Sequence, residues 1–533
     1  MMRAAPAMVR LTMVALAQAL MLTGADAVFA GPAENAQLLA AAQAQDPETA
    51  LYALQQGADA KAREADGTTA LHYAAHHGMA PLAAALLKAK ADPNARNDYG
   101  ATPLAEAAEI GDATVIGLLL RAGADTEARN AEGQTALMAV ARAGKVDAAK
   151  LLLKAGANVN ARESWAGQTA LMWAAAQSQS EMVKLLVANK ADVNARGAIR
   201  DWQRRVTAEP RPKGMNRGGF TPLLYAAREG CIDCARALLA GKADINLADP
   251  ERTSPLLLAI MNFHNDFAAF LIKAGADVDM WDLYGQTPLY VAIDMNTLPR
   301  GGRPDLPSED AMTGFEVAQR LLEAGANPNL QLKLRPPYRN YIFDRGGDQV
   351  LSTGATALMR AAKGGDVPSV KLLLQHHALV DLPSEEGITP LMVAAGMGHG
   401  ANPTRGRYKT DAEAAECVRL LQEAGAAVNG RNRTKGTALH SAAAHGWSDT
   451  VKLLVAKGAE LEAEDVQGLT PIDYAAGRYA RAFLEPEPKN WADTVTLLHG
   501  YIVAATGHEP KESRGPRPAQ SRGTGGTEQA QAR

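Results

Sequence analysis

A glycine-led motif returns at a nearly constant spacing along most of the chain. The glycine precedes a Thr-Pro-Leu or Thr-Ala-Leu triplet, and its first occurrences, at Gly67, Gly100, Gly133 and Gly167, lie 33, 33 and 34 positions apart. Later pairs lie 33 and 32 positions apart, at Gly354 and Gly387 and at Gly436 and Gly468. A fixed period of this length predicts a stack of equal units instead of one compact core, which 533 residues would in any case exceed.

One unit, residues 98–130, shows what each period contains. Thr102 is placed to cap a helix whose first residue is Pro103, where the missing N–H of proline does no harm. Gly111 can end that helix in the left-handed conformation, and a second apolar stripe then runs to Gly123. Neither helix can bury its stripe alone, so each unit needs its neighbours for stability.

These motifs resemble the ankyrin-repeat family, both in the helix start Gly67-Thr68-Thr69-Ala70-Leu71-His72 and in the turn Ala122-Gly123-Ala124-Asp125. The resemblance implies an all-α solenoid of stacked helix-turn-helix units with β-turn fingers. We expect about twelve repeats within residues 31–500: an N-terminal capping unit and eleven helix starts at Thr69, Thr102, Thr135, Thr169, Thr221, Ser254, Thr287, Thr356, Thr389, Thr437 and Thr470.

Four insertions break the period, at 198–217, 297–314, 331–352 and 400–413. The first and third fall in finger loops, which in this architecture line the concave side, and the other two fall between the helices of a repeat. The segment 198–217 carries six basic against two acidic residues, and 331–352 carries four against two. Arginine beside Trp and Tyr is typical of protein-interface hot spots, although the same composition suits solvated loops. The hypothetical partner-binding residues are Trp202, Arg204, Arg205, Arg335, Tyr338, Arg339 and Tyr341.

The two ends of the chain follow a different logic. Arg3 and Arg10 precede an apolar run from Leu11 to Leu22 and small residues, which predicts a signal peptide at 1–30 cleaved near Ala27 or Ala30. We therefore expect a periplasmic or secreted protein with no stable membrane insertion after cleavage. Residues 501–533 are rich in Gly, Pro, Arg and Gln and are expected to form a disordered tail.

Chemistry-bearing motifs are few. Cys231 and Cys234 are spaced for a local disulfide or two buried thiols, while Cys417 has no obvious partner. No catalytic signature, metal-ligand set or cofactor motif is present, and a net charge of −3 argues against nucleic acid as the partner. We predict a non-enzymatic scaffold for a protein partner. The alternatives are a redox or maturation accessory that uses Cys231 and Cys234, and a carbohydrate or cell-wall binder.

Overall fold

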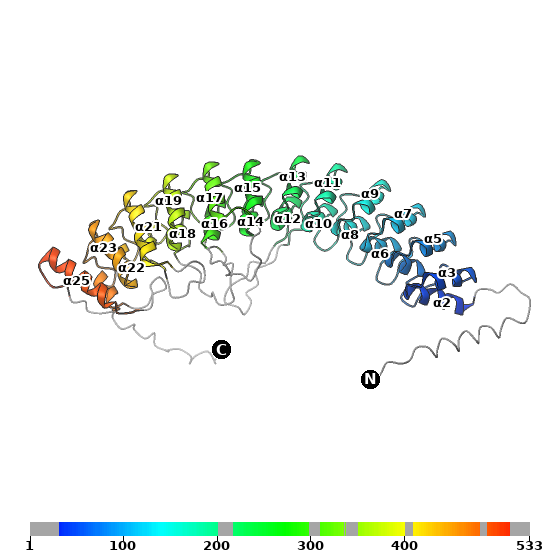
Figure 1. Ribbon diagram of the computed structural model, residues 1–533, viewed down its shortest axis with the longest axis horizontal. Coiled ribbons are helices and arrows are strands. Elements are labelled where there is room, and N and C mark those ends of the chain that lie inside the picture. The colour runs from blue at the N-terminus through cyan, green and yellow to red at the C-terminus, as the bar shows by residue number, and fades with distance from the viewer. Residues whose placement is uncertain are drawn as a thin grey trace, which may run out of the picture. The chain divides into compact units, whose positions relative to one another are not determined.

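The computed structural model describes residues 31–200, 217–297, 310–334, 336, 350–399, 409–479 and 488–511 (Figure 1). Within these ranges the chain forms 24 helices, and β-structure is limited to two isolated bridges. The chain divides into two compact units, the first ending at Trp165 and the second beginning at Ala166. The predicted all-α repeat architecture is confirmed.

The helices of the first unit are α2 (Pro32–Gln43), α3 (Pro47–Gln55), α4 (Ala70–His76), α5 (Ala80–Lys88), α6 (Pro103–Ile110), α7 (Ala113–Arg121), α8 (Ala136–Arg142) and α9 (Val146–Lys154). Those of the second unit are α10 (Ala170–Ala176), α11 (Ser180–Ala188), α12 (Pro222–Glu229), α13 (Ile232–Ala240), α14 (Pro255–Met261), α15 (Asn265–Lys273), α16 (Pro288–Asn296), α17 (Gly314–Glu323), α18 (Ala357–Gly364), α19 (Val367–Gln375), α20 (Pro390–Ala394), α21 (Asp411–Glu423), α22 (Ala438–His445), α23 (Ser448–Ala456), α24 (Pro471–Ala475) and α25 (Ala492–Thr506).

The helix boundaries follow from local chemistry, as α6 and α7 show. The hydroxyl of Thr102 accepts a hydrogen bond from the amide of Ala105 at 3.2 Å, and α6 ends at Gly111, whose φ is 75°. Asp112 then caps α7 by accepting from the amide of Val115 at 3.0 Å. Helices of eight and nine residues are marginal alone in water, so their stability comes from packing.

Within each unit, first helices pack on first helices and second helices on second helices. In the second unit, α12 contacts α14 and α14 contacts α16, while α11 contacts α13 and α15 contacts α17. Figure 1 accordingly shows the even-numbered and odd-numbered helices of this unit as two separate rows. Small side chains allow this close approach: Ala226, Ala227 and Ala259 on first helices are completely buried.

The fingers between repeats are turns that bond to one another at their tips. In the first unit, Gly100 adopts a φ of 75°, and the side chain of Asn97 accepts from the amide of Ala101 at 2.9 Å. The amide of Asp98 then donates to the carbonyl of Asp66 in the preceding finger at 2.8 Å. Fingers in each unit are therefore hydrogen-bonded layers, not independent loops.

The repeat period of 32 predicted between Gly436 and Gly468 is wrong. Lys435, and not Gly436, takes the left-handed conformation, with a φ of 58°, at the place that Gly468 occupies one finger later with a φ of 77°. From Lys435 to Gly468 the period is 33, the same as in the first repeats, and the value of 32 arose from counting Gly436. Gly436 was counted because glycine usually fills this turn position, but here the residue with the left-handed backbone is Lys435.

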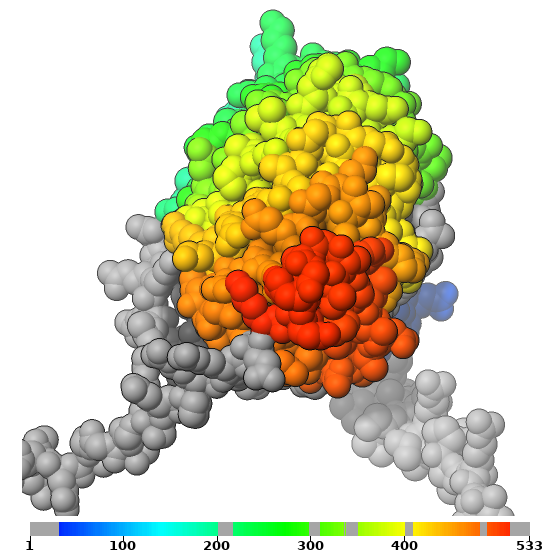
Figure 2. All heavy atoms as spheres, turned by 90° about the vertical axis from the view of Figure 1, so that its left-hand side faces the viewer, coloured from blue at the N-terminus to red at the C-terminus, as the bar shows by residue number. Residues whose placement is uncertain are grey.

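One insertion ends in helix, and one predicted boundary is wrong. Thr410 and Glu413 form a reciprocal cap that starts α21 at Asp411, so the last residues of the insertion expected at 400–413 lie in the first turn of a 13-residue helix, whereas α19 has nine residues. The tail expected from 501 begins later, because Ile502 is completely buried and continues the apolar face of α25 to Thr506. Figure 2 shows this last helix at the C-terminal end of the second unit.

A connection longer than the period predicts separates α24 from α25. Residues 476–491 separate these two helices, whereas α12 and α13 are separated by only two residues. The composition of 476–491 gave no separate motif, and the last repeat has no following finger from which the period could be measured.

Candidate functional site

The seven hypothetical partner-binding residues, Trp202, Arg204, Arg205, Arg335, Tyr338, Arg339 and Tyr341, all lie outside the described residues. What the structure does describe is the pair of stems from which the two finger insertions leave and to which they return. The candidate site therefore consists of those stems and of the fingers that lie between them.

The first stem is a short antiparallel hairpin. Ile199 and Gly218 form a bridge, and the amide of Arg200 donates to the carbonyl of Arg217 at 2.7 Å. At the base, the amide of Gly197 donates to the carbonyl of Phe220 at 3.0 Å. Residues 201–216 therefore start and end at the tip of one finger.

The second stem is also held by main-chain hydrogen bonds. The amide of Leu332 donates to the carbonyl of Ala355 at 3.0 Å, and the amide of Gly354 donates to the carbonyl of Leu332 at 2.8 Å. The side-chain amide of Gln331 adds a hydrogen bond of 2.7 Å to the carbonyl of Gly354. Residues 335–349 are thus also carried by a finger.

Two ordinary fingers separate the stems and connect to the second one. The amide of Leu283 donates to the carbonyl of Glu251 at 2.8 Å, and the amide of Lys333 donates to the carbonyl of Tyr284 at 2.8 Å. On the side of the first stem, Gly219 lies against Pro250, because a Cβ at Gly219 would be 2.9 Å from the proline ring. The tips of these four fingers form one continuous edge within the second unit.

A stack of two cations on one indole occupies the middle of this edge. The guanidinium carbon of Arg252 lies 3.8 Å from the ring centroid of Trp281, and Nζ of Lys333 lies 5.2 Å from a ring centroid of the same side chain. Both cationic side chains belong to exposed residues. We call Arg252, Trp281 and Lys333 the cation–indole cluster. Cation–π contacts of this kind contribute about 0.5–1 kcal/mol each at exposed sites.

The backbone of Arg252 is strained. Its φ of 65° is left-handed, in the turn position that glycine fills in most other fingers. A non-glycine residue there costs roughly 1–2 kcal/mol. A strained arginine that stacks on an aromatic ring is the kind of outlier that points to a functional role.

Apolar side chains and one acidic group flank the cluster. Ile199, Leu283 and Leu334 are 53%, 44% and 50% exposed. Burial, followed by the charge of Asp249, raises the pKa of Glu251, while the charge of Arg217 acts in the opposite direction. The edge thus combines exposed aliphatic groups with fixed cations, a composition suited to contact with another protein.

The inner helices offer a second surface, which is open over only part of the second unit. Four residues after each capping Thr or Ser stand Trp173, Tyr225 and Leu258, all partly exposed. The equivalent residues Val291 and Arg360 are 0% and 1% exposed. The guanidinium of Arg228 lies 5.1 Å from the ring centroid of Tyr225. The open part of this face, from α10 to α14, adjoins the first stem.

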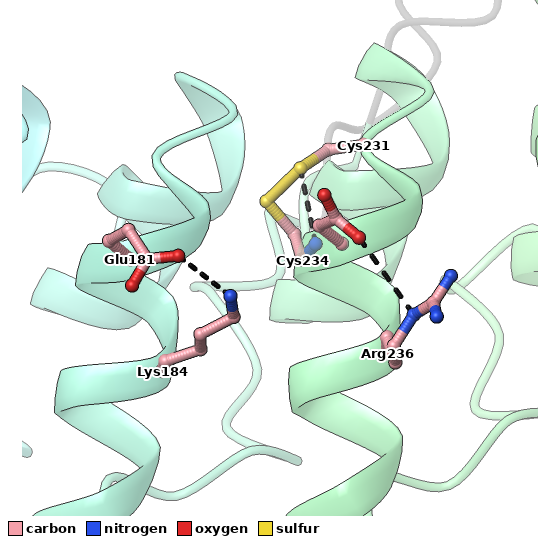
Figure 3. Close-up of a disulfide and its surroundings, with 6 residues drawn as sticks. Glu181, Lys184, Cys231, Cys234 and Arg236 are labelled. Carbon is pink, nitrogen blue, oxygen red and sulfur yellow. Dashed lines mark hydrogen bonds and ion pairs between the residues drawn. A yellow bond between two sulfur atoms is a disulfide. The ribbon is translucent and has the colours of Figure 1, made fainter.

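The two sulfur atoms of Cys231 and Cys234 are joined in a disulfide at the start of α13 (Figure 3). Of the alternatives left open by the sequence, the structure therefore has the local disulfide and not two thiols. Cys417 is a free thiol, and burial raises its pKa to about 11.

A buried polar cluster next to α20 was not found from the sequence. Nζ of Lys409 donates to the carbonyls of Ala362, Val393 and Ala394 at 3.1, 2.8 and 2.8 Å, which satisfies the ends of α18 and α20. Burial lowers the pKa of Lys409 to about 7. Its sequence neighbours are polar, so no pattern indicated a buried lysine.

Two histidines and a tryptophan adjoin this lysine. The ring of His445 stacks on that of Trp447 with centroids 4.6 Å apart, and the ring of His399 meets His445 edge-on at 5.5 Å. Burial lowers the pKa of His399 to about 3 and that of His445 to about 4. Lys409 and His445 both donate to main-chain carbonyls, which indicates a structural role for these two side chains.

The described ranges contain neither clustered metal ligands nor a membrane-spanning helix. No group of three or more His, Cys, Asp or Glu side chains in those ranges could hold a metal ion. No helix of the described ranges is both long and apolar enough to cross a membrane.

Comparison with known families agrees with the geometry. The family model for ankyrin repeats in three copies matches residues 38–130, 105–197, 223–300, 308–402 and 410–489, and the model for a single ankyrin repeat matches 386–433. These ranges cover well over half of the chain. The expected total of about twelve repeats stays a prediction.

Curated relatives match parts of the chain. The B-cell lymphoma 3 protein homolog of Mus musculus is 27% identical over 290 residues, 51% of this chain and 54% of that protein. Ankyrin repeat domain-containing protein 63 of Homo sapiens is 37% identical over 25% of this chain and 32% of its own length. Ankyrin repeat and SOCS box protein 16 of Homo sapiens is 30% identical over 48% and 47%. The chain thus spans about half or less of these relatives.

Proposed function

The chain belongs to the ankyrin-repeat family, and from this premise we propose that it is a non-enzymatic scaffold that holds a protein partner at the finger edge of its second unit. Ankyrin repeats are protein-interaction scaffolds, whose repeated fold supplies a rigid support and whose surface residues select the partner. The contact residues and the location of the protein are the parts that we propose here.

One observation carries the proposal: both enlarged fingers rise from a single edge, on either side of the cation–indole cluster. The hairpin stem at Ile199 and Gly218 and the stem at Leu332 and Ala355 are separated by only two fingers. Lys333, in the finger that carries the second stem, itself contacts Trp281. Ligand contacts in proteins concentrate on such loops, because a rigid scaffold can position them.

The chemistry of the edge favours a protein partner with an acidic surface. Arg252 and Lys333 present exposed charge, and the indole between them offers a large planar area with little side-chain entropy to lose. Arginine also binds a carboxylate through two parallel hydrogen bonds. The exposed aliphatic groups Leu283 and Leu334 would exclude water around such a contact.

We further propose that the protein works outside the cytoplasm, after cleavage of residues 1–30 near Ala27 or Ala30. The support comes from the basic, apolar and small-residue order of that segment. The disulfide between Cys231 and Cys234 adds support, because disulfides persist in oxidising compartments. Radiolabelled or tagged precursor should appear in the periplasmic or culture fraction at a mass reduced by the signal segment. A precursor that keeps its full mass in the cytoplasm would refute this location.

The binding proposal is tested by affinity capture with the exported protein, followed by measurement with the purified partner. Replacing Trp281 with Ala should weaken binding at least tenfold, in the range of an aromatic hot spot, about 1.4 kcal/mol or more. Tyr99→Ala is the matched control, since it removes an exposed aromatic from a finger of the first unit and should change the affinity less than about twofold.

Circular dichroism of both variants checks that the repeats remain folded. Equal affinity of wild type and Trp281→Ala would remove the cation–indole cluster from the contact. Failure to retain any stoichiometric protein would reject the scaffold function itself.

A further inference from the structure

The start of α13 differs chemically from the start of other second helices. Cys231 is its N-terminal cap, and its Sγ accepts a hydrogen bond from the amide of Cys234 at 3.2 Å. The same two residues form the disulfide, whose bond leans from α13 toward α11 in Figure 3. The sulfur of Cys231 therefore both forms the disulfide and accepts a hydrogen bond from one of the first amides of the helix, which have no partner within the helix.

Two other second helices have a carboxylate at this position, whereas Met79, Lys145 and Gln179 stand there in α5, α9 and α11 and form no side-chain cap. Asp112 caps α7 and accepts from the amides of Thr114 and Val115, and Asp366 caps α19 and accepts from the amide of Ser369. In both helices the carboxylate accepts a hydrogen bond from the amide three residues later, as the sulfur of Cys231 does in α13. In α7 and α19 these amides thus stabilise a negative acceptor, and a thiolate of Cys231 released by reduction would keep its bond from the Cys234 amide and meet the favourable end of the helix dipole.

The two sulfurs differ in access. Cys234 is 0% exposed, at the same point of its helix as the core residue Val115, whereas Cys231 is partly exposed. Cys417, equally buried, shows what such an environment does to a thiol, since burial raises its pKa. An attacking thiolate can therefore reach Cys231 and not Cys234, and the thiol left at Cys234 would be protonated.

The surroundings leave the approach to Cys231 polar. The ring of His264 lies against the preceding turn, because a Cβ at Gly230 would be 2.5 Å from Nδ1 of His264. On α13 itself Asp233 and Arg236 form an ion pair at 3.8 Å, and on α11 Glu181 and Lys184 form one at 2.7 Å (Figure 3). The charges near the disulfide are thus mutually paired, and a thiolate would meet no unbalanced carboxylate.

We propose that Cys231 and Cys234 are an exchangeable disulfide whose substrate is a protein dithiol, with Cys231 as the sulfur that is attacked. This exchange is independent of the binding function proposed above, because it uses neither the finger edge nor the cation–indole cluster.

The exchange balances as a two-electron transfer. A thiolate of the partner attacks Sγ of Cys231, a mixed disulfide forms, and the bond to Cys234 breaks; the Cys234 sulfur leaves as a thiolate and takes up a proton. The second thiolate of the partner then attacks the partner's own sulfur in the mixed disulfide and releases Cys231 as a thiolate. The partner is oxidised to a disulfide, and this chain is reduced by two electrons. Stabilisation of the Cys231 thiolate favours that direction.

Two single-cysteine variants in a Cys417→Ala background test the assigned roles. In Cys234→Ser, alkylation of Cys231 by iodoacetamide should be half-maximal at least about one pH unit below the value of about 8.5 for a free thiol. In Cys231→Ser, alkylation of Cys234 should be at least about a hundredfold slower than that of Cys231 at neutral pH, because only the exposed sulfur is a thiolate. Circular dichroism confirms that both variants are folded.

The exchange itself is measured on the folded full chain with reduced thioredoxin as the dithiol probe. Loss of the Cys231–Cys234 disulfide within minutes at neutral pH, without loss of helicity, is the expected result. Mass spectrometry of the Cys234→Ser variant, incubated with oxidised glutathione, should find glutathione on Cys231. A disulfide that is reduced only in denaturant, or a Cys231 thiol that titrates at about 8.5 or above, would show a purely structural crosslink and overturn the proposal. Either failure leaves the Trp281 binding test unaffected.

Discussion

Acidification should destabilise the second unit through His445. Burial lowers the pKa of this histidine from 6.5 to about 4, while the hydrogen bond to the Gly396 carbonyl acts in the opposite direction. Its Nε2 donates to that carbonyl at 2.9 Å, so the folded form holds the neutral ring. The ring lies so close to Gly396 that a Cβ there would be 2.5 Å from Cδ2.

The sign and size of the effect follow from linkage between protonation and folding. Between pH 6.5 and about pH 4 the unfolded chain binds a proton at this residue that the folded chain does not. Stability is therefore complete above pH 6.5 and falls as the pH decreases through that window. From about pH 7 to about pH 5 the loss amounts to about 2 kcal/mol for His445 alone. His399, whose pKa burial lowers to about 3, changes stability in the same direction.

The assay is hydrogen exchange of the α20 and α22 amides at several pH values, corrected for the intrinsic exchange rate. Local opening energies are appropriate because a repeat array does not unfold as one two-state unit. His445→Gln keeps a side-chain N–H for the Gly396 carbonyl and removes the titration, so its loss between about pH 7 and about pH 5 should be smaller than that of the wild type by about 2 kcal/mol. His377→Gln, at an exposed residue, is the matched control and should keep the wild-type profile. An unchanged pH dependence in His445→Gln would refute the assignment.

Two further outcomes follow from the second unit. Arg360→Ala should lower the local opening free energy of α16 and α18, measured by hydrogen exchange, by about 3–5 kcal/mol, because it leaves the carboxylate of Asp294 buried without its cation. The double change Arg360→Met with Asp294→Leu should cost much less, and equal losses would contradict this reading. Lys435→Gly should stabilise the protein by up to about 1 kcal/mol in the same assay, since it relieves a left-handed lysine, and Lys435→Ala, which keeps the Cβ, should bring no such gain.

The helix pairs were predictable because their signals are local. Thr102 and Pro103 start a helix and Gly111 ends it within a few residues, and the spacing of such starts revealed the stacking unit. The finger position of the insertions at 198–217 and 331–352 followed from the same arithmetic. An error arose where local signals competed, because Gly436 stands next to the strained Lys435 and was counted in its place. The helical end of the insertion at 400–413 was not expected, although Thr410 and Glu413 have the spacing of a reciprocal cap.

The candidate site was only partly readable. The sequence indicated the two basic segments as candidate contact regions. It did not indicate the cation–indole cluster, because Arg252, Trp281 and Lys333 come from three successive fingers that are brought together by hydrogen bonds between their tips. The buried environment of Lys409 depends in the same way on the ends of two separate helices, α18 and α20. Neither arrangement has a sequence period.

The sequence by itself thus determined the repeat, its helices and the family, because turns, caps and apolar stripes act over a few residues and recur with every unit. Tertiary structure alone decided which side chains of different repeats meet: the cations that stack on Trp281, the inner-helix residues that stay open, and the depth that separates Cys231 from Cys234. Contact and burial are properties of neighbours in space, and a solenoid creates those neighbours only when its units stack.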